Sequence, residues 1–143
     1  MSKTLTVVLF LSFSMSVVST LTGKIIGAKI RHIIAYTAKN KLVSTALHYL
    51  NSPYLWGGKS PFGIDCSGFV QCVYQLHGIQ LPRDAYLQAT HGETLGFIDE
   101  SEPGDLAFFD DQEGKITHVG IIMPDYHIIH AFGQVRIDRL DQT

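Results

Sequence analysis

Apolar and polar positions follow a helical period in two stretches of the first half of the chain. Apolar residues recur at helical spacing between Lys41 and Leu50, and residues 51–53 (Asn-Ser-Pro) end that pattern. Residues 54–63 are rich in Gly and Pro, which indicates a loop. Asp65 then has the position of an N-cap for a second helix over residues 66–76, which a following glycine closes.

The second half of the chain reads instead as short apolar runs separated by turns. Before these runs, the pattern predicts only a turn at residues 81–84 and a short helix near Ala85–Thr90. Four strand-like runs follow, at Asp105–Asp110, Thr117–Met123, His127–Phe132 and Val135–Asp138. Helices followed by antiparallel strands predict an α+β fold, with the helices packed on an antiparallel sheet.

A stretch of different character precedes these elements. Lys3 is followed by the apolar run Leu5–Leu21, which contains several Ser and Thr residues. This order is typical of a signal peptide or membrane anchor, and its length is marginal for a membrane span. Three basic residues follow the run, and the positive-inside rule would keep that flank in the cytoplasm. A buried apolar element is the alternative interpretation.

Composition and charge support a division of the chain at this point. The 143 residues allow one domain at about 150 residues per domain, and 45% hydrophobic with 17% charged residues is typical of a globular protein. Residues 1–64 carry seven Lys or Arg and no acid, whereas residues 65–143 have a net charge of −9. The overall charge of −2 disfavours a nucleic-acid binder. We therefore expect an N-terminal segment, 1–35, and one catalytic domain, 36–143.

Cys66 is the strongest candidate for chemistry. It lies in the predicted first turn of a helix, where backbone N–H groups and the helix dipole stabilise a thiolate and lower the pKa of the thiol. The same N–H groups can hold an oxyanion. The alternative is an inert, buried cysteine, which fits Cys72 better. Because these two residues lie on different faces of one helix, we expect no disulfide between them.

A cysteine nucleophile needs a base, and two histidines have suitable positions. His118 is the polar exception in one apolar strand, and His130 lies twelve residues later in the next strand. Adjacent antiparallel strands can place the two imidazoles side by side, one to take the thiol proton and the other to orient it. Two structural histidines are the alternative. Together with Cys66 and Cys72 they match no compact zinc spacing, so we expect neither a metal nor a cofactor.

An ordered set of motifs resembles the NlpC/P60 family of cysteine peptidases. The motifs are Tyr54-Leu-Trp-Gly-Gly, Ile64-Asp-Cys-Ser-Gly-Phe-Val-Gln, Leu81-Pro-Arg, Pro103-Gly-Asp-Leu-Ala-Phe-Phe, His118-Val-Gly-Ile and Ile129-His-Ala. They cover about Leu42 to Asp138, in the family's order and at similar spacing. The resemblance implies a papain-like α+β fold, with the nucleophile at a helix N-terminus, that acts on bacterial cell-wall peptides.

The same resemblance implies a role for each catalytic residue. Cys66 is the nucleophile, His118 is the base and His130 is the third member, which orients the base. Tyr54 directs its hydroxyl at the active site and helps the Cys66 backbone N–H to stabilise the oxyanion.

The resemblance also implies substrate-binding residues, which are Asp65, Ser67, Trp56 and Arg83. In relatives that cut γ-D-glutamyl-diamino acid bonds, positions like Asp65 and Ser67 contact a free N-terminal L-alanine. An acid beside the nucleophile suits such an ammonium group, and Arg83 suits a stem carboxylate. Asp65 can serve as a helix N-cap at the same time.

The implied reaction is hydrolysis of peptidoglycan stem-peptide amide bonds, between D-glutamate and a diamino acid, through a thiolate acyl-enzyme. The alternatives are a non-catalytic or truncated wall-binding homologue, and an amidase or acyltransferase on the same fold. We expect a monomer that binds stem peptides or their fragments and no nucleic acid. It would be secreted or lie in the bacterial cell envelope, with membrane association through residues 4–22, and the cytoplasm is the alternative location.

Three departures from the family pattern qualify this expectation. Ala85 stands where many relatives carry Ser, which removes one hydrogen bond to substrate. With 143 residues, we expect none of the upstream SH3-like domains that close one end of the cleft in some relatives. Relatives usually continue beyond the position of Thr143 into a further strand, so we expect a sheet that lacks its last strand and has an unpaired edge.

Overall fold

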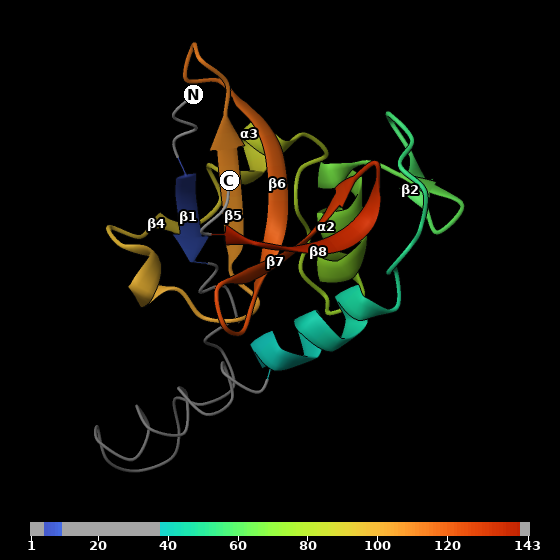
Figure 1. The fold of residues 1–143 in the computed structure, drawn as a ribbon, viewed down its shortest axis with the longest axis horizontal. Helices are drawn as coiled ribbons and strands as arrows, with labels where there is room; N and C mark the ends of the chain where they lie inside the picture. Colours follow the sequence, from blue (N-terminus) through green and yellow to red (C-terminus); the bar gives the residue numbers. More distant parts are fainter. Residues whose placement is uncertain (1–4, 10–37, 141–143) are drawn as a thin grey trace.

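The computed structural model describes residues 5–9 and 38–140 (Figure 1). Residues 38–47 are helical. The labelled elements are β1 (Leu5–Leu9), β2 (Lys59–Ser60), β3 (Gly63–Ile64), α2 (Cys66–Gln75), α3 (Ala85–Gln88), β4 (Glu93–Thr94), the 3-10 helix η1 (Ile98–Glu100), β5 (Leu106–Asp110), β6 (Ile116–Met123), β7 (His127–Phe132) and β8 (Gln134–Arg139). The predicted helices and the four predicted strands are present within a few residues of their expected bounds, which confirms the α+β fold.

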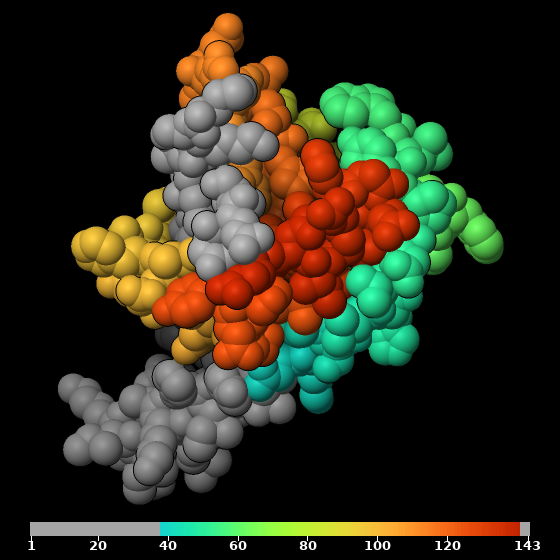
Figure 2. Space-filling model, in the orientation of Figure 1, coloured from blue at the N-terminus to red at the C-terminus, as the bar shows by residue number. Residues whose placement is uncertain are grey.

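A six-stranded sheet in the order β4-β1-β5-β6-β7-β8 forms the frame of the molecule, and all its neighbours are antiparallel. Strands β5 to β8 form the predicted meander. The segment that follows the first helix extends this frame at β8, because the N–H of Asn51 donates to the Val135 carbonyl and the N–H of Val135 donates to the Ser52 carbonyl, both at 2.8 Å. Figure 2 shows this green segment packed against the red β8.

β1 was not predicted as a strand. It pairs with β5 from Leu5 opposite Phe109 to Val8 opposite Leu106, and with β4 on its other side. The backbone of β5 is therefore paired on both edges, with β1 on one side and β6 on the other. For Leu5–Leu9 the strand agrees with the alternative of an apolar element of the domain. The rest of the proposed signal or anchor, residues 10–22, lies outside the described part of the chain.

Helix α2 covers one face of the sheet and contacts β6 and β7 (Figure 1). Its buried residues Phe69, Val70, Val73 and Tyr74 pack with Leu106, Phe108, Val119, Ile121 and Ile129 of the sheet and with Leu42 and Ala46 of the first helix. Each Val, Leu, Ile or Phe side chain among them contributes about 1.5–3 kcal/mol when fully buried. Neighbouring strand residues, among them Phe109, Ile122 and Ile128, form a smaller cluster on the opposite face. No helix among residues 38–140 has the length and apolar character needed to cross a bilayer.

Two local devices hold the elements that carry the site. The Asp65 side chain accepts a hydrogen bond from the Gly68 N–H at 2.7 Å, which confirms Asp65 as the N-cap of α2. At the start of β5, buried Lys39 lies 2.8 Å from Asp105 and 3.0 Å from Glu102. Gly104, at φ +97°, lies so close to Lys39 that a Cβ there would clash with its carbonyl oxygen at 2.8 Å. This turn therefore fixes β5 against the first helix.

Candidate active site

Cys66 is the first residue of α2 and is 8% exposed. Its Sγ lies 4.0 Å from the Thr117 carbonyl oxygen of β6. Burial raises the pKa of the Cys66 thiol above its ordinary value, although backbone N–H groups of Val119, Ser67 and Cys66 itself act to lower it. The prediction of a lowered pKa is therefore wrong: the helix N-terminus is in place, but burial outweighs it. A base must take the proton as the sulfur attacks.

His118 on β6 and His130 on β7 lie side by side, as their spacing predicts. Nε2 of His118 is 2.7 Å from Nδ1 of His130, and the ring planes meet at 71°. Gly120 leaves room for side chains of β7, because a Cβ there would clash with Cδ1 of Ile128 and would lie 2.8 Å from the His130 Cβ. Phe109 and Phe132 flank His118, with ring centroids at 5.7 and 6.1 Å. Two phenyl rings therefore contact the His118 imidazole.

The structure adds two residues that the sequence analysis missed. Nε2 of His130 lies 2.8 Å from Oδ2 of Asp138 on β8. Oδ1 of Asp138 accepts from Nη2 and Nε of Arg136, at 2.7 and 3.1 Å. The β7–β8 register sets Arg136 opposite His130. Asp138, two residues further along β8, is the diagonal neighbour of His130 on the same face. The signal that could have found them is the alternation of charged with apolar residues in this predicted strand.

Contacts within this cluster and burial set the charge states of Asp138 and His130. Burial acts to raise the pKa of Asp138, but hydrogen bonds from Arg136 and His130 outweigh it and hold that pKa below its ordinary value. Burial lowers the pKa of His130, and the hydrogen bond to Asp138 opposes this only in part. An ionised Asp138 therefore faces a neutral His130 near neutral pH.

One cavity of about 540 Å³ is lined by Tyr54, Cys66, His118, His130 and Asp138, together with Phe109, Phe132 and their neighbours. The backbone N–H of Tyr54 donates to the Gly133 carbonyl at 3.0 Å, which fixes Tyr54 beside the β7–β8 turn. Burial raises the pKa of Tyr54, and the charges of Cys66 and Asp65 add to this effect. The structure thus brings all four predicted catalytic side chains to one cavity.

Three of the predicted substrate-binding residues form a separate cluster outside the lining of that cavity. Oδ1 of Asp65 accepts from the Gly68 N–H at 2.7 Å and from Nη1 of Arg83 at 2.9 Å. Oδ2 accepts from Nη2 of Arg83 at 2.7 Å and from the Gly57 N–H at 2.9 Å. Nη1 of Arg83 also donates to the Ser67 hydroxyl at 2.9 Å.

This cluster is largely satisfied by the protein itself. Burial acts to raise the pKa of Asp65, but hydrogen bonds from Arg83 and the Gly68 N–H lower it below its ordinary value. The Ser67 hydroxyl adds a fifth and longer contact, to Oδ1 of Asp65 at 3.4 Å. A carboxylate offers about four acceptor sites, so these contacts use all of them. The fourth predicted residue, Trp56, is 87% exposed and does not line the cavity.

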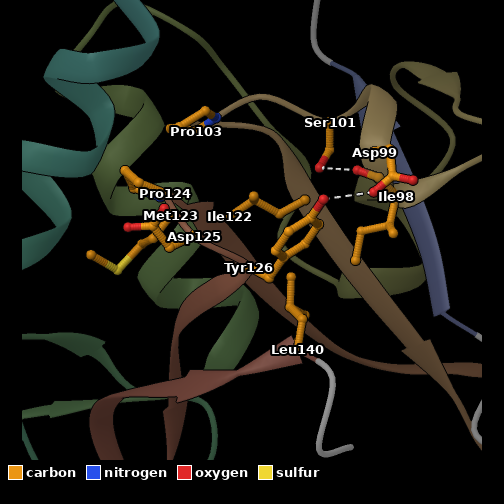
Figure 3. Close-up of a pocket in the computed structure, with 10 residues that line it drawn as sticks. All are labelled: Ile98, Asp99, Ser101, Pro103, Ile122, Met123, Pro124, Asp125, Tyr126 and Leu140. Atoms are coloured by element: carbon orange, nitrogen blue, oxygen red, sulfur yellow. Dashed lines mark hydrogen bonds between the residues drawn. The ribbon is translucent and has the colours of Figure 1, made fainter.

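A smaller hollow of about 180 Å³ lies elsewhere on the described part of the molecule (Figure 3). The Tyr126 hydroxyl donates to Asp99 across it at 2.7 Å, and Ile98, Ile122 and Leu140 surround the ring. Its lining contains neither cysteine nor histidine. The groups suited to nucleophilic chemistry therefore belong to the larger cavity.

Comparison with known proteins agrees with this geometry. The family model described as NlpC/P60 family matches residues 51–143. A γ-D-glutamyl-L-lysine dipeptidyl-peptidase of Bacillus subtilis (strain 168) is 41% identical over 92 residues, which are 63% of this chain and 31% of that protein. The bifunctional muramidase/DL-endopeptidase CwlT of the same strain is 49% identical over 84 residues, 56% of this chain and 25% of that protein.

Solved structures give the same picture. A crystal structure of an NlpC/P60 family protein from Bacillus cereus ATCC 10987 matches with a TM-score of 0.68 at 35% identity, over 72% of this chain and 35% of that chain. The chain spans less than a third of the length of the two curated relatives. The similarity therefore concerns one domain of longer proteins.

Proposed function

The chain belongs to the NlpC/P60 family, and from this premise we propose that it is a cysteine peptidase that cuts peptidoglycan stem peptides between D-glutamate and a diamino acid. The observation that carries the proposal is the cavity in which Cys66 at a helix N-terminus meets the His118–His130 pair. The names of the two B. subtilis relatives support the substrate, since one specifies a γ-D-glutamyl-L-lysine bond and the other a DL-endopeptidase.

The geometry supports a two-step reaction. The Cys66 sulfur forms a bond to the γ-carbonyl carbon of D-glutamate while His118 takes the thiol proton. We assign the stabilisation of the resulting oxyanion to the Cys66 N–H and the Tyr54 hydroxyl, both of residues that line the cavity. Collapse of this intermediate breaks the amide bond, and the amine of the diamino acid leaves with the proton from His118. Water, deprotonated by His118, then hydrolyses the thioester and restores the thiol.

The raised pKa of the Cys66 thiol fits this sequence of events. A neutral thiol transfers its proton to the imidazole only as the carbon–sulfur bond forms, so a permanent ion pair is not required. The phenyl rings of Phe109 and Phe132 contact the His118 ring, with centroids 5.7 and 6.1 Å away, and so limit the orientations open to this imidazole.

Mass spectrometry of defined peptides tests the proposal. The full chain is incubated with L-Ala-γ-D-Glu-L-Lys and with the corresponding meso-diaminopimelate peptide, and we expect the dipeptide L-Ala-D-Glu to be released. The Cys66→Ala variant is expected to lose all measurable cleavage. The Cys72→Ala variant is a matched control from the same helix and is expected to retain it. Equal activity of both variants, or cleavage at another bond, would contradict the proposal.

The same experiment separates the alternative functions. A folded protein that pulls down with peptidoglycan sacculi and releases no dipeptide would be a wall-binding domain. A product in which D-glutamate is joined to an added amine, and not to water, would identify an acyltransferase. We propose that the protein meets its substrate as a monomer, secreted or in the cell envelope, and sedimentation and cell fractionation test these two points.

A further inference from the structure

We propose that Asp138 is a positioning residue that sets the tautomers of both histidines and leaves Nδ1 of His118 as the atom that takes the Cys66 proton. The catalytic part of this inference rests on the proposed function. The structural part rests on three contacts within the described residues, which join Arg136, Asp138, His130 and His118 in a line.

The direction of the hydrogen bonds along this line follows from the donors and acceptors available. An ionised carboxylate can only accept, so Nε2 of His130 must donate to Asp138 across their 2.8 Å contact. A neutral imidazole has a single N–H, so Nδ1 of His130 then carries a lone pair. That lone pair must accept from Nε2 of His118 across 2.7 Å. The remaining nitrogen of His118, Nδ1, is left with the lone pair that a general base needs.

Arg136 makes this direction robust. It donates twice to Oδ1 of Asp138, at 2.7 and 3.1 Å, and so directs the other oxygen, Oδ2, at His130. The Arg136 guanidinium also lies 5.9 Å from the centre of the Phe132 ring, within the range of a cation–π contact. Arg136 therefore holds the Asp138 carboxylate in place from the side that faces away from the imidazoles.

The substitution Asp138→Asn reverses the line while preserving its shape. The amide oxygen stays with Arg136, which is only a donor, so the amide NH₂ faces Nε2 of His130. His130 must then accept at Nε2 and donate from Nδ1 to Nε2 of His118. His118 consequently carries its proton on Nδ1 and has no lone pair for the thiol. In serine proteases, a comparable Asp→Asn change that imposes the wrong tautomer lowers kcat by about 10⁴.

The decisive measurement is nitrogen-15 NMR of labelled histidine in the full chain without substrate, with signals assigned by His118→Gln and His130→Gln. We expect the Nε2–H tautomer for both histidines in the wild type and the Nδ1–H tautomer for both in Asp138→Asn. We also expect kcat of Asp138→Asn to fall by at least about 100-fold, with KM changed by less than about threefold, because the defect lies in proton transfer.

A double variant distinguishes positioning from a merely structural role. In Asp138→Asn with Arg136→Met, the amide is free to turn its oxygen toward His130, which restores the original direction. We therefore expect this double variant to be at least about tenfold more active than Asp138→Asn alone. Loss of two contacts from a structural cluster would instead lower activity further. Glu113→Gln removes an exposed carboxylate from the β5–β6 turn and is expected to change neither the tautomers nor kcat.

The inference about Asp138 and the proposed function can fail independently of each other. An Nδ1–H tautomer of His118 in the wild type, or unchanged tautomers in a folded Asp138→Asn, overturns the inference even if the wild type cuts the peptide. If the wild type cuts nothing but the tautomers behave as expected, the inference about Asp138 holds and the peptidase proposal fails. The wild-type tautomers alone decide the matter if Asp138→Asn does not fold.

Discussion

Two carboxylate–arginine pairs lie near Cys66, and they use the same chemistry differently. Arg83 contacts both oxygens of Asp65, and the N–H groups of Gly57 and Gly68 take the remaining acceptor sites. Arg136 contacts only Oδ1 of Asp138, and the second oxygen faces a histidine of the cavity. Both oxygens of Asp65 are therefore used to hold the N-terminus of α2 and Arg83. One oxygen of Asp138 is instead available to accept from His130 and so to direct its proton.

The burial of the two pairs also differs. The side chains of Asp65 and Arg83 are 11% and 34% exposed, and those of Asp138 and Arg136 are 28% and 46% exposed. An exposed ion pair contributes about 0–1 kcal/mol to stability, whereas breaking a buried pair costs about 3–5 kcal/mol. We therefore expect the first pair to affect mainly stability and the second mainly catalysis.

The largest expected effect on stability comes from Arg83→Met. Because the Arg83 side chain is one-third exposed, we expect a loss of about 2 kcal/mol in the free energy of unfolding, below the range for a fully buried pair. Urea unfolding measures it. The matched change Arg136→Met is expected to cost less than about 1 kcal/mol. Equal losses for the two variants would remove the distinction between the pairs.

A smaller effect, on pH dependence, is expected from Arg136→Met. Arg136 lowers the pKa of Asp138, although burial acts to raise it. The positive charge of Arg136 also lowers the pKa of His130, in the same direction as burial. Both pKa values therefore rise when Arg136 is removed. Since the active form has Asp138 ionised and His130 neutral, the acid limb of kcat/KM moves to higher pH. A profile recorded against the wild type checks this, and a shift to lower pH would contradict it.

The smallest expected effect concerns the amino terminus of the substrate. Asp65 has its acceptor sites occupied, so an ammonium group gains little from it. We expect an N-acetylated L-Ala-γ-D-Glu-L-Lys peptide to be cut with kcat/KM within about threefold of the free peptide, a difference below about 0.7 kcal/mol. A preference of 100-fold or more would show that the substrate displaces Arg83 and that the Asp65 pair is open to ligands.

The parts of the fold that follow from local pattern could be predicted from the sequence. The N-cap Asp65 and the helix that begins at Cys66 are encoded within a few neighbouring residues, and the four strands of the meander are encoded by their alternation and turns. The pairing of His118 with His130 follows from one strand, one turn and one return strand. These relations all span short distances along the chain.

The features that could not be predicted depend on long-range packing. The raised pKa of Cys66 comes from burial between α2 and β6, which no local pattern reveals. The role of Asp138 depends on the exact β7–β8 register, since a shift of one residue would turn it to the other face. Trp56 is exposed because no other element among the described residues packs over its side chain, which depends on the tertiary arrangement and not on the local sequence.

The pairing of β1 with β5 also has a consequence in time. The ribosome adds about 5–20 residues per second, so the partners Leu5 and Phe109 are synthesised roughly 5–20 s apart. During that interval the apolar residues of β1 have no sheet to join and are available to any targeting factor that binds apolar segments. Slower translation lengthens this interval and faster translation shortens it. The rate of synthesis is therefore expected to influence how many copies keep their first strand in the sheet.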